Sequence, residues 1–414
     1  MIRHYYQLEF IQRSPLRIGA GFGEDTDSDV IQDRRGMPFL PGSSLAGLLR
    51  SEFEPDTAEQ LFGYVKSDGK TRESRVLISD ATLPGDAAVR IATRDGVGLN
   101  ERKTAVPGAN YDFQTAESDK PYRAVLELTD GAFAPALKTA LERWIALGVS
   151  VGARTTRGYG QMEVSVRDRS FSLPEDLEAW MAFEPFDTGA FSDCLPWKKT
   201  DAREAGIDLL RASLRIKGTF SVRNNTSDLV QPGNAVAPDT VPMENWSGNP
   251  VIPGTSWAGA FLHRMRSMAG DLDLGGDAKQ EIDRLFGVDP EAKRRSAIRF
   301  SETEIAGSER MLVTRTAIER FTAAPRNRAL FTSEVAVGGT GELTVTIPSD
   351  TPARVKGLLG AALFDLHLGL LGFGGENGIG RGQAEITRLT VNGTDRTEAL
   401  AEGRLSALWK EASE

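Results

Sequence analysis

Two glycine-rich motifs recur in this 414-residue chain, and this repeat constrains the fold more than any other feature. The block VGARTTRGYGQMEV begins at Val151, and FGGENGIGRGQAEI begins at Phe373, an offset of 222 residues. A second pair lies upstream: MPFLPGSSLAGLLR begins at Met37 and NPVIPGTSWAGAFL at Asn249, an offset of 212 residues. Two motifs that recur in the same order at nearly the same offset indicate a duplicated domain. One unit built twice can repeat one binding event along a linear ligand.

Each copy has the same predicted order of secondary structure, because apolar alternation predicts strands and helical periodicity predicts helices. In the first copy the strands are expected at 5–11, 75–82, 123–128 and 161–166, and the helices at 43–54 and 134–147. In the second copy the strands are expected at 213–222, 297–304, 342–347 and 383–389, and the helices at 255–268 and 352–371. The order β-α-β-β-α-β is the ferredoxin-like pattern.

We therefore expect an α+β protein with two tandem ferredoxin-like (βαββαβ) domains. The first domain is expected at 1–167 and the second at 212–414, with a partly ordered linker at 168–211. Between the second and third strands of each copy, a long polar segment is expected to form an irregular arm. These arms are Arg94 to Lys120 and Thr314 to Thr332.

Composition limits the classes of protein to consider. A hydrophobic content of 40% with 26% charged residues is ordinary for a soluble globular protein. The net charge of −9 argues against indiscriminate nucleic-acid binding, but arginines gather near the repeated motifs and are compatible with a local basic groove. The single cysteine, Cys194, excludes an internal disulfide and a cysteine-based zinc site. With neither an apolar signal core nor a membrane span in the sequence, we expect a cytoplasmic protein that has no membrane partner.

The repeated turns point to phosphate as a ligand. A glycine-rich loop between a helix and a strand lets backbone N–H groups approach a ligand, and phosphate is a common ligand of such groups. The PGSS and PGTS turns offer N–H groups and hydroxyls at a helix start, which suits a phosphate or a ribose. A plainer interpretation stands beside each: the glycines permit a tight turn, and the hydroxyls cap a helix. Nucleotide motifs fail, because the P-loop and dinucleotide glycines would fall on Tyr64 and Glu24.

An acidic loop, GEDTDSDVIQD, precedes the first PGSS motif. It is not an EF-hand, because the required glycine and glutamate positions hold Val30 and Gly36. At the offset of 212, only Asp27 among the acidic residues from 25 to 29 keeps an acidic counterpart, Asp239. A single carboxylate beside a phosphodiester can hold Mg²⁺ or act on a 2′-hydroxyl, although a solvated acidic loop is the plainer interpretation.

Together these segments resemble the RAMP superfamily of CRISPR-associated proteins, and most closely the repeating backbone subunit of type III effector complexes. The resemblance covers both copies and most of the chain apart from the linker. In the first copy it rests on LRIGAG (16–21), DSDVIQD (27–33), PFLPGSSLAGLLR (38–50), GLNERKTAVPGANYDF (98–113) and GARTTRGYGQ (152–161). In the second copy it rests on NPVIPGTSWAG (249–259), RTAIERFTAAPRNRALF (315–331) and GFGGENGIGRGQ (372–383).

The resemblance implies an RRM-like unit that grips the backbone of a guide RNA with its PGSS helix and glycine-rich loop. It implies that the arm, called the thumb, wedges between guide and target, and that an aspartate cuts the target RNA beside the displaced base. The implied RNA-binding residues are Ser43, Ser44, Arg50, Arg154, Arg157, Gly158, Gly160, Thr255, Ser256, Arg264, Gly374, Gly375, Gly378, Gly380 and Arg381. The implied thumb residues are Arg102, Lys103, Arg320 and Phe321.

The same resemblance implies Asp27 and Asp239 as catalytic and metal-binding residues, with Asp25 or Asp29 as alternatives to Asp27. The expected cofactor is Mg²⁺ or another divalent cation, and no organic cofactor is expected. The expected partners are a CRISPR guide RNA, a complementary target RNA, and other effector subunits including the large signalling subunit. One departure is that Asn245 in the second copy replaces Asp33.

Two other functions remain open. The chain could be a structural RNA-binding scaffold whose acidic loops are inert. It could also be a guide-processing RNase of the same superfamily that uses a histidine base, such as His263, and needs no metal. The second alternative is disfavoured because no histidine recurs between the copies.

Overall fold

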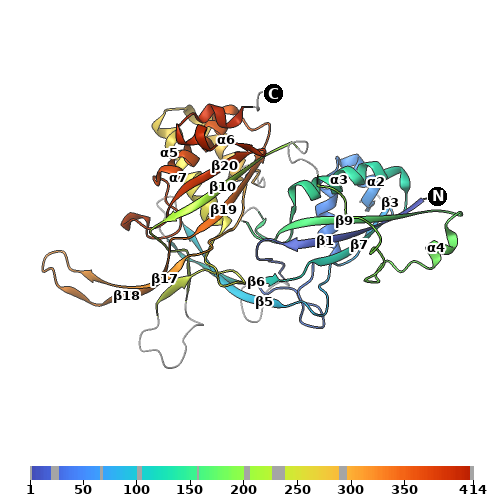
Figure 1. The fold of residues 1–414 in the computed structure, drawn as a ribbon, viewed down its shortest axis with the longest axis horizontal. Helices are drawn as coiled ribbons and strands as arrows, with labels where there is room; N and C mark the ends of the chain where they lie inside the picture. Colours follow the sequence, from blue (N-terminus) through green and yellow to red (C-terminus); the bar gives the residue numbers. More distant parts are fainter. Residues whose placement is uncertain are drawn as a thin grey trace. The chain divides into compact units, whose positions relative to one another are not determined.

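The computed structural model describes residues 2–19, 28–65, 69–99, 105–155, 158–199, 206–225, 238–288 and 296–410. The chain separates into two compact units, Met1–Thr155 with Tyr159–Ala205 and Gly206–Glu414 with Thr156–Gly158. In both units, helices cover one face of an antiparallel sheet (Figure 1). Among the described residues, no helix combines the length and the apolar character that crossing a membrane requires.

The first unit contains a five-stranded sheet with the order β4–β7–β1–β9–β8. Its strands are β1 (Ile2–Gln12), β4 (Val76–Ile78), β7 (Tyr122–Leu128), β8 (Val149–Ser150) and β9 (Gln161–Ser172). Its other elements are α1 (Gly42–Arg50), α2 (Pro55–Phe62), β2 (Tyr64–Val65), β3 (Thr71–Arg72), β5 (Val89–Leu99), β6 (Ala105–Ser118), η1 (Gly131–Phe133), α3 (Ala134–Leu147) and α4 (Leu177–Met181).

The second unit contains a sheet with the order β15–β19–β10–β20–β21. Its strands are β10 (Ile207–Lys217), β15 (Arg299–Phe300), β19 (Thr340–Pro348), β20 (Gln383–Val391) and β21 (Thr394–Asp395). Its helices are α5 (Gly254–Asp271), α6 (Gly275–Phe286), α7 (Ala353–Leu368), η4 (Asn377–Ile379), α8 (Thr397–Ala401) and η5 (Leu405–Trp409). Its remaining strands are β11 (Thr219–Phe220), β12 (Arg223–Asn225), β13 (Thr240–Pro242), β14 (Val251–Ile252), β16 (Thr303–Glu304), β17 (Glu309–Ile318) and β18 (Pro325–Val337).

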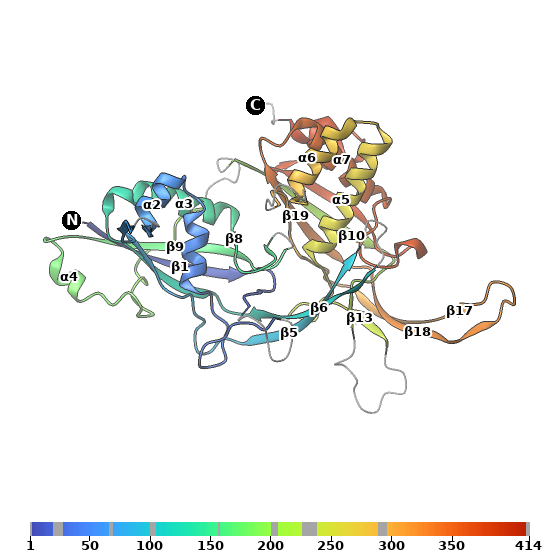
Figure 2. The same ribbon diagram turned by 180° about the vertical axis from the view of Figure 1, so that it is seen from behind.

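The two sheets share one topology. In each, the first strand of the repeat lies between the third and the fourth, and the second strand lies at the edge beside the third. The main helices come after the first and the third strand, and both lie on the same side of the sheet (Figure 2). The prediction of two tandem ferredoxin-like domains is therefore confirmed.

Alternation along the first strand of each unit builds its core. On β1, Tyr6, Leu8 and Phe10 are buried between the sheet and the helices. On β10, alternate apolar residues from Leu210 to Ile216 do the same in the second unit. Each large apolar side chain buried in this way contributes roughly 1.5–3 kcal/mol, so this face fixes the register of both strands.

The segment predicted as a linker contributes ordered structure. Strand β9 continues to Ser172, and β10 begins at Ile207, so both strands extend into the range 168–211. The chain after β9 packs on the second face of the first sheet, where Tyr5 lies against Phe171 and Phe191. Trp180 Nε1 donates a hydrogen bond to Tyr5 Oη at 2.9 Å. These contacts cover an open face of the first sheet with apolar side chains.

The expectation of irregular arms was wrong. The first arm is a β-hairpin of β5 and β6, and the second is a hairpin of β17 and β18. Four helices, α2, α4, α6 and α8, were also missed, and α1 ends at Arg50 rather than at residue 54. Most residues of β17 in the second arm are exposed, so that strand lacks the continuously buried face whose alternation identifies a strand in a sequence.

Candidate nucleic-acid interface

Three segments meet at the base of the arm in each unit. They are the chain that follows the first sheet strand, the glycine-rich loop, and the loop that precedes the PGSS or PGTS motif. We call this last segment the acidic loop in both units, because it contains Asp27 in the first and Asp239 in the second. One backbone hydrogen bond joins the acidic loop to the chain after the first strand in each unit. Ile31 N donates to Ile18 O at 2.9 Å in the first unit, and Met243 N donates to Val222 O at 2.7 Å in the second. We call this region the arm base. Its equivalent contacts in both units show that the duplication extends to individual hydrogen bonds.

The glycine-rich loops are fixed by three matched hydrogen bonds. Two of them join the loop to the chain after the first strand, and the third closes the loop on itself. The matched pairs are Ala153 N–Arg17 O (2.7 Å) with Gly375 N–Ser221 O (2.8 Å), Gly160 N–Pro15 O (2.9 Å) with Gly382 N–Thr219 O (2.9 Å), and Val151 N–Gly160 O (2.9 Å) with Phe373 N–Gly382 O (2.9 Å). Several loop amides that were expected to face a ligand are therefore bonded to the protein itself.

The glycines of these loops fall into two groups. A Cβ at Gly160 or Gly382 would lie 1.9 Å from the carbonyl oxygen of the residue nine positions earlier, and both residues have positive φ, 65° and 73°. Gly152 and Gly374 also pack on a backbone carbonyl, so close packing explains all four. By contrast, nothing lies within 4 Å of a Cβ built at Gly378 or Gly380. The open side of the second loop is therefore at Gly378 and Gly380.

The PGSS and PGTS turns start helices α1 and α5 without capping by their own side chains. Pro41 and Pro253 occupy the N-cap positions, and no side chain there makes a capping hydrogen bond. Our interpretation of the hydroxyls as helix caps was wrong, because the serines and the threonine lie within the first turn. Ser43 and Ser44 are exposed, whereas Thr255 and Ser256 are half-buried.

One residue at the first helix start was missed by sequence reasoning. The Asp80 carboxylate accepts a hydrogen bond from Gly42 N at 2.7 Å, so a protein anion already occupies this amide. The signal was present, because Ser79-Asp80 matches Ser301-Glu302 at the offset of 222. The serines of this pair make equivalent bonds, Val125 N to Ser79 Oγ (3.0 Å) and Thr344 N to Ser301 Oγ (2.9 Å).

Two predicted RNA-binding arginines make contacts inside the helical layers. Arg50 donates from Nη1 to the carbonyl oxygen of Gly63, just after α2, at 3.1 Å. Arg264 on α5 pairs with the buried Asp365 on α7, with Nε and Oδ2 2.5 Å apart. These contacts give both arginines a role in holding helices together.

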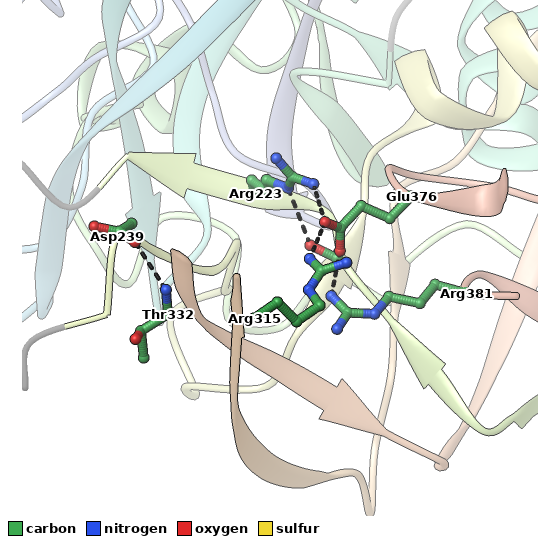
Figure 3. A network of polar contacts seen from close by, with 7 residues as sticks. Arg223, Asp239, Arg315, Thr332, Glu376 and Arg381 are labelled. Carbon is green, nitrogen blue, oxygen red and sulfur yellow. Dashed lines mark hydrogen bonds and ion pairs between the residues drawn. The ribbon is translucent and has the colours of Figure 1, made fainter. Parts of the chain in front are cut away.

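The acidic loop of the second unit lies against its arm. Asp239 is exposed, its N–H donates to Thr332 O at 2.7 Å, and its Oδ2 accepts from Thr332 N at 2.9 Å (Figure 3). In the first unit, Gln114 N on β6 donates to Ser28 O at 3.0 Å, and Val30 N donates to Gln114 Oε1 at 3.1 Å. Each acidic loop is thus bonded to the second strand of its own arm.

Asp27, the first predicted catalytic residue, lies outside the described residues, as do Asp25, Arg102, Lys103 and Arg157. Asp29 is described and is half-buried. Ser28, which directly follows Asp27, is the residue bonded to the first arm. In the second unit the equivalent neighbours are Asp239 and Thr240.

The replacement of Asp33 by Asn245 leaves the loop unchanged. Asp33 Oδ1 accepts from the backbone N–H groups two and four residues further on, at 2.8 and 3.0 Å. Asn245 Oδ1 accepts from the equivalent groups, both at 3.0 Å. In the first unit, these N–H groups and Arg35 hold the pKa of Asp33 below its usual value. The side chain therefore shapes a turn, a role that an amide fills as well as a carboxylate.

A family model for the RAMP superfamily matches residues 12–163 and 210–385. The chain belongs to the RAMP superfamily. The match covers both repeats and indicates a CRISPR-associated RNA-binding subunit. Among curated proteins, none matches this sequence.

In this RAMP chain, the tip of the second arm presents an aromatic ring. Phe321 is 91% exposed, and its neighbour Arg320 is also exposed. The Glu319 carboxylate accepts hydrogen bonds from Phe321 N (2.7 Å) and Thr322 N (2.9 Å), and these bonds lower the pKa of Glu319. The tip is therefore a formed turn that holds the ring outward.

Arg154 and Arg381 in the two RAMP loops contact the protein at the arm base. The Arg154 guanidinium lies 4.1 Å from the ring centroid of Tyr111 on β6 and also donates to the Tyr111 hydroxyl. Arg381 is buried and forms an ion pair with Glu376, which is bound by two further arginines (Figure 3). Glu376 was not among the predicted site residues. The sequence could have identified Glu376, because it aligns with Arg154 at the offset of 222.

A divalent cation is compatible with the donors at Asp239, although they do not form a complete site. Among the described residues, no group of three His, Cys, Asp or Glu side chains gathers in a way that could hold a metal ion. Mg²⁺ often binds through one or two carboxylates together with water and substrate phosphates. The exposed carboxylate of Asp239 fits this pattern, in which most of the ligands come from RNA and water.

Proposed function

We propose that this RAMP chain is a backbone subunit of a type III CRISPR effector complex. In this proposal it binds a guide RNA along both repeats and cleaves the complementary target RNA. The catalytic residues are Asp27 in the first repeat and Asp239 in the second. The observation that supports this most directly is the hydrogen bonding of each acidic loop to the second strand of its own arm. A carboxylate at that point lies next to the element that contacts paired RNA.

The composition of the second arm supports contact with RNA. Residues 309–337 contain five arginines and three glutamates, whereas the whole chain carries a net charge of −9. Guanidinium groups bind phosphates, and aromatic rings stack on bases regardless of their sequence. The exposed ring of Phe321 beside Arg320 combines both properties at the tip.

The chemistry assigned to the aspartates is simple. Asp27 and Asp239 each position a carboxylate that can accept the proton of a 2′-hydroxyl or orient the RNA beside the scissile phosphate. These two residues would also hold a divalent cation, which when bound supplies positive charge against the phosphodiester. The hydrogen bond from Thr332 N fixes the orientation of the Asp239 carboxylate.

The test is cleavage of a labelled complementary RNA by the assembled complex in Mg²⁺. We expect two cuts in the wild type, loss of one cut in Asp27→Ala, loss of the other in Asp239→Ala, and no cleavage in the double variant. EDTA should abolish both cuts. Persistent cutting by the double variant at both positions would refute the assignment.

Two controls sharpen this experiment. Asp33→Asn copies the residue found in the second repeat and should cut normally, because the turn needs only a side-chain oxygen. Asp29→Ala tests the neighbouring carboxylate, and loss of the first cut in this variant but not in Asp27→Ala would move the catalytic role to Asp29.

The alternative is a non-catalytic scaffold that binds the guide RNA. It is favoured by one observation: an oxygen of the Asp239 carboxylate already accepts a backbone hydrogen bond, which is a structural role. Intact target RNA in the wild-type complex, with guide binding retained, would support this alternative.

A further inference from the structure

One position in the glycine-rich loop has an unusual backbone in both repeats. Arg154 and Glu376 are equivalent at the offset of 222, and both have positive φ, 57° and 61°. A residue other than glycine in this left-handed region costs about 1–2 kcal/mol. Glycines surround both positions in the sequence, so a side chain retained here at that cost points to a function of the side chain.

In the first unit, the side chain at this position attaches the loop to the arm. The Arg154 guanidinium lies over the rings of Tyr111 and Phe113 on β6, 4.1 and 5.0 Å from their centroids. Such cation–π contacts hold two elements together without a second charged group.

In the second unit, the opposite charge makes the equivalent attachment. The Glu376 carboxylate binds three guanidinium groups: Arg381 in its own loop, Arg315 on β17 of the arm, and Arg223 on β12 at 2.9 Å. Its side chain is only 17% exposed. Burial raises the pKa of Glu376, but the hydrogen bond from Arg315 and the charges of the other two arginines outweigh it and lower that pKa.

The strand order shows that Glu376 joins two separate strands of one sheet, the five-stranded sheet at the arm base of the second unit. Strand β18 lies between β17 and β13, and β12 pairs with β13, so β17 and β12 are opposite edges of the arm-base sheet. Figure 3 shows the Arg223 and Arg315 side chains reaching Glu376 from these two strands. Removing the charge of this carboxylate would leave the three guanidinium groups without the anion that pairs them here, and their repulsion would push the arm from the loop.

We propose that position 154/376 is the arm-positioning residue of both repeats, and that Glu376 is the electrostatic clasp of the second arm. The clasp itself is a property of the chain alone. Its consequence for cleavage rests on the proposed function, because a loosened arm would misplace the RNA beside Asp239.

The test is peptide-resolved hydrogen exchange on the full chain without RNA. In Glu376→Gln, amides of β17 and β18 should exchange about tenfold faster, because the local opening energy falls. Peptides of the first arm and of α5 and α7 should stay protected. Unchanged protection of β17 and β18 would overturn the proposal, and so would an equal loss of protection throughout the second unit.

Glu385→Gln is the matched control. Glu385 on β20 binds two cations, Arg215 (2.7 Å) and Lys217 (3.6 Å), so the same substitution removes an equivalent ionic contact away from the arm. It should leave arm exchange unchanged. Arg154→Ala is the reciprocal variant and should loosen the first arm only.

A double variant separates electrostatics from loop strain. If repulsion among the arginines opens the arm, Arg315→Gln should slow exchange in the Glu376→Gln background although it accelerates exchange in the wild type. Additive effects would overturn the electrostatic clasp, because strain in the loop backbone does not depend on Arg315.

The link to cleavage is read in the assembled complex. Glu376→Gln should reduce the cut assigned to Asp239 relative to the cut assigned to Asp27, with guide binding retained. A loosened arm with an unchanged ratio of cuts would break the link to cleavage and leave the clasp intact. If the wild type makes no cuts, the proposed function fails, and the exchange experiment still decides the clasp.

Discussion

Three glycines of the second loop form a natural series that separates backbone packing from ligand approach. At Gly382, φ is 73° and a Cβ would lie 1.9 Å from Phe373 O. At Gly380, φ is 84° but no atom lies within 4 Å of a Cβ. At Gly378, no atom lies within 4 Å, and its φ is not in the left-handed region. Alanine at Gly382 therefore adds both a steric clash and backbone strain. Alanine at Gly380 adds backbone strain alone, and alanine at Gly378 adds neither.

The expected costs follow from these geometries. A left-handed φ costs an alanine about 1–2 kcal/mol, and forcing a methyl group into a packed backbone costs about 1–3 kcal/mol more. Gly382→Ala should therefore destabilise the second unit by about 2–5 kcal/mol, and Gly380→Ala by about 1–2 kcal/mol. Gly378→Ala should stay within about 0.5 kcal/mol of the wild type. In the first unit, Gly160→Ala should behave like Gly382→Ala, because its Cβ would also lie 1.9 Å from a carbonyl oxygen.

The assay is urea unfolding of the full chain, followed by hydrogen exchange so that each unit reports its own transition. Gly382→Ala should shift only the second unit, and Gly160→Ala only the first. A cost of Gly382→Ala no greater than that of Gly380→Ala would refute the packing argument. Weaker RNA binding by Gly378→Ala at unchanged stability would show that this glycine serves the ligand rather than the fold.

Two further predictions concern charged groups of the second unit. Asp208→Ala removes the partner of Lys356 Nζ, 2.6 Å away in a largely buried pair, and should cost about 3–5 kcal/mol in the urea transition. Combining it with Lys356→Met should recover part of that loss, and no recovery would contradict the role of the buried ammonium. Because the fold lowers the pKa of Glu376 from 4.5, its ion pairs should stabilise the unit fully above that pH and be lost as the pH falls through the folded pKa. The stability difference between the wild type and Glu376→Gln should shrink over that window, and a constant difference would exclude the carboxylate as its source.

The fold was predictable because its signals are local and occur twice. Alternating apolar residues such as Tyr6, Leu8 and Phe10 identify a strand with one buried face. The second arm was not predictable as strands, because most residues of β17 are exposed on both sides of the ribbon. Met311, Leu312 and Phe331 are exposed on the second arm, so apolar character there does not mark a core.

The site was predictable at the level of segments but only partly at the level of atoms. The repeat alignment identified the acidic loop, the glycine-rich loop and the arm as matching segments of both copies, and the structure brings them together at each arm base. It could not distinguish a glycine required by a nearby carbonyl, such as Gly382, from one with open surroundings, such as Gly378. That distinction depends on which backbone lies opposite, and the opposing residues are far away in the sequence.

The pair Arg154 and Glu376 shows why residue type alone misleads at such a site. Considered singly, an arginine in a glycine-rich loop suggests a phosphate ligand, and a glutamate in the same place suggests none. The shared backbone conformation directs both side chains to the arm base, where the arm supplies aromatic rings in one unit and an arginine in the other. The direction of the side chain is therefore the same in both repeats, while its charge differs with the contacting group: a cation lies over aromatic rings, and an anion pairs with an arginine. An alignment reports the charge, and only the structure reports the direction.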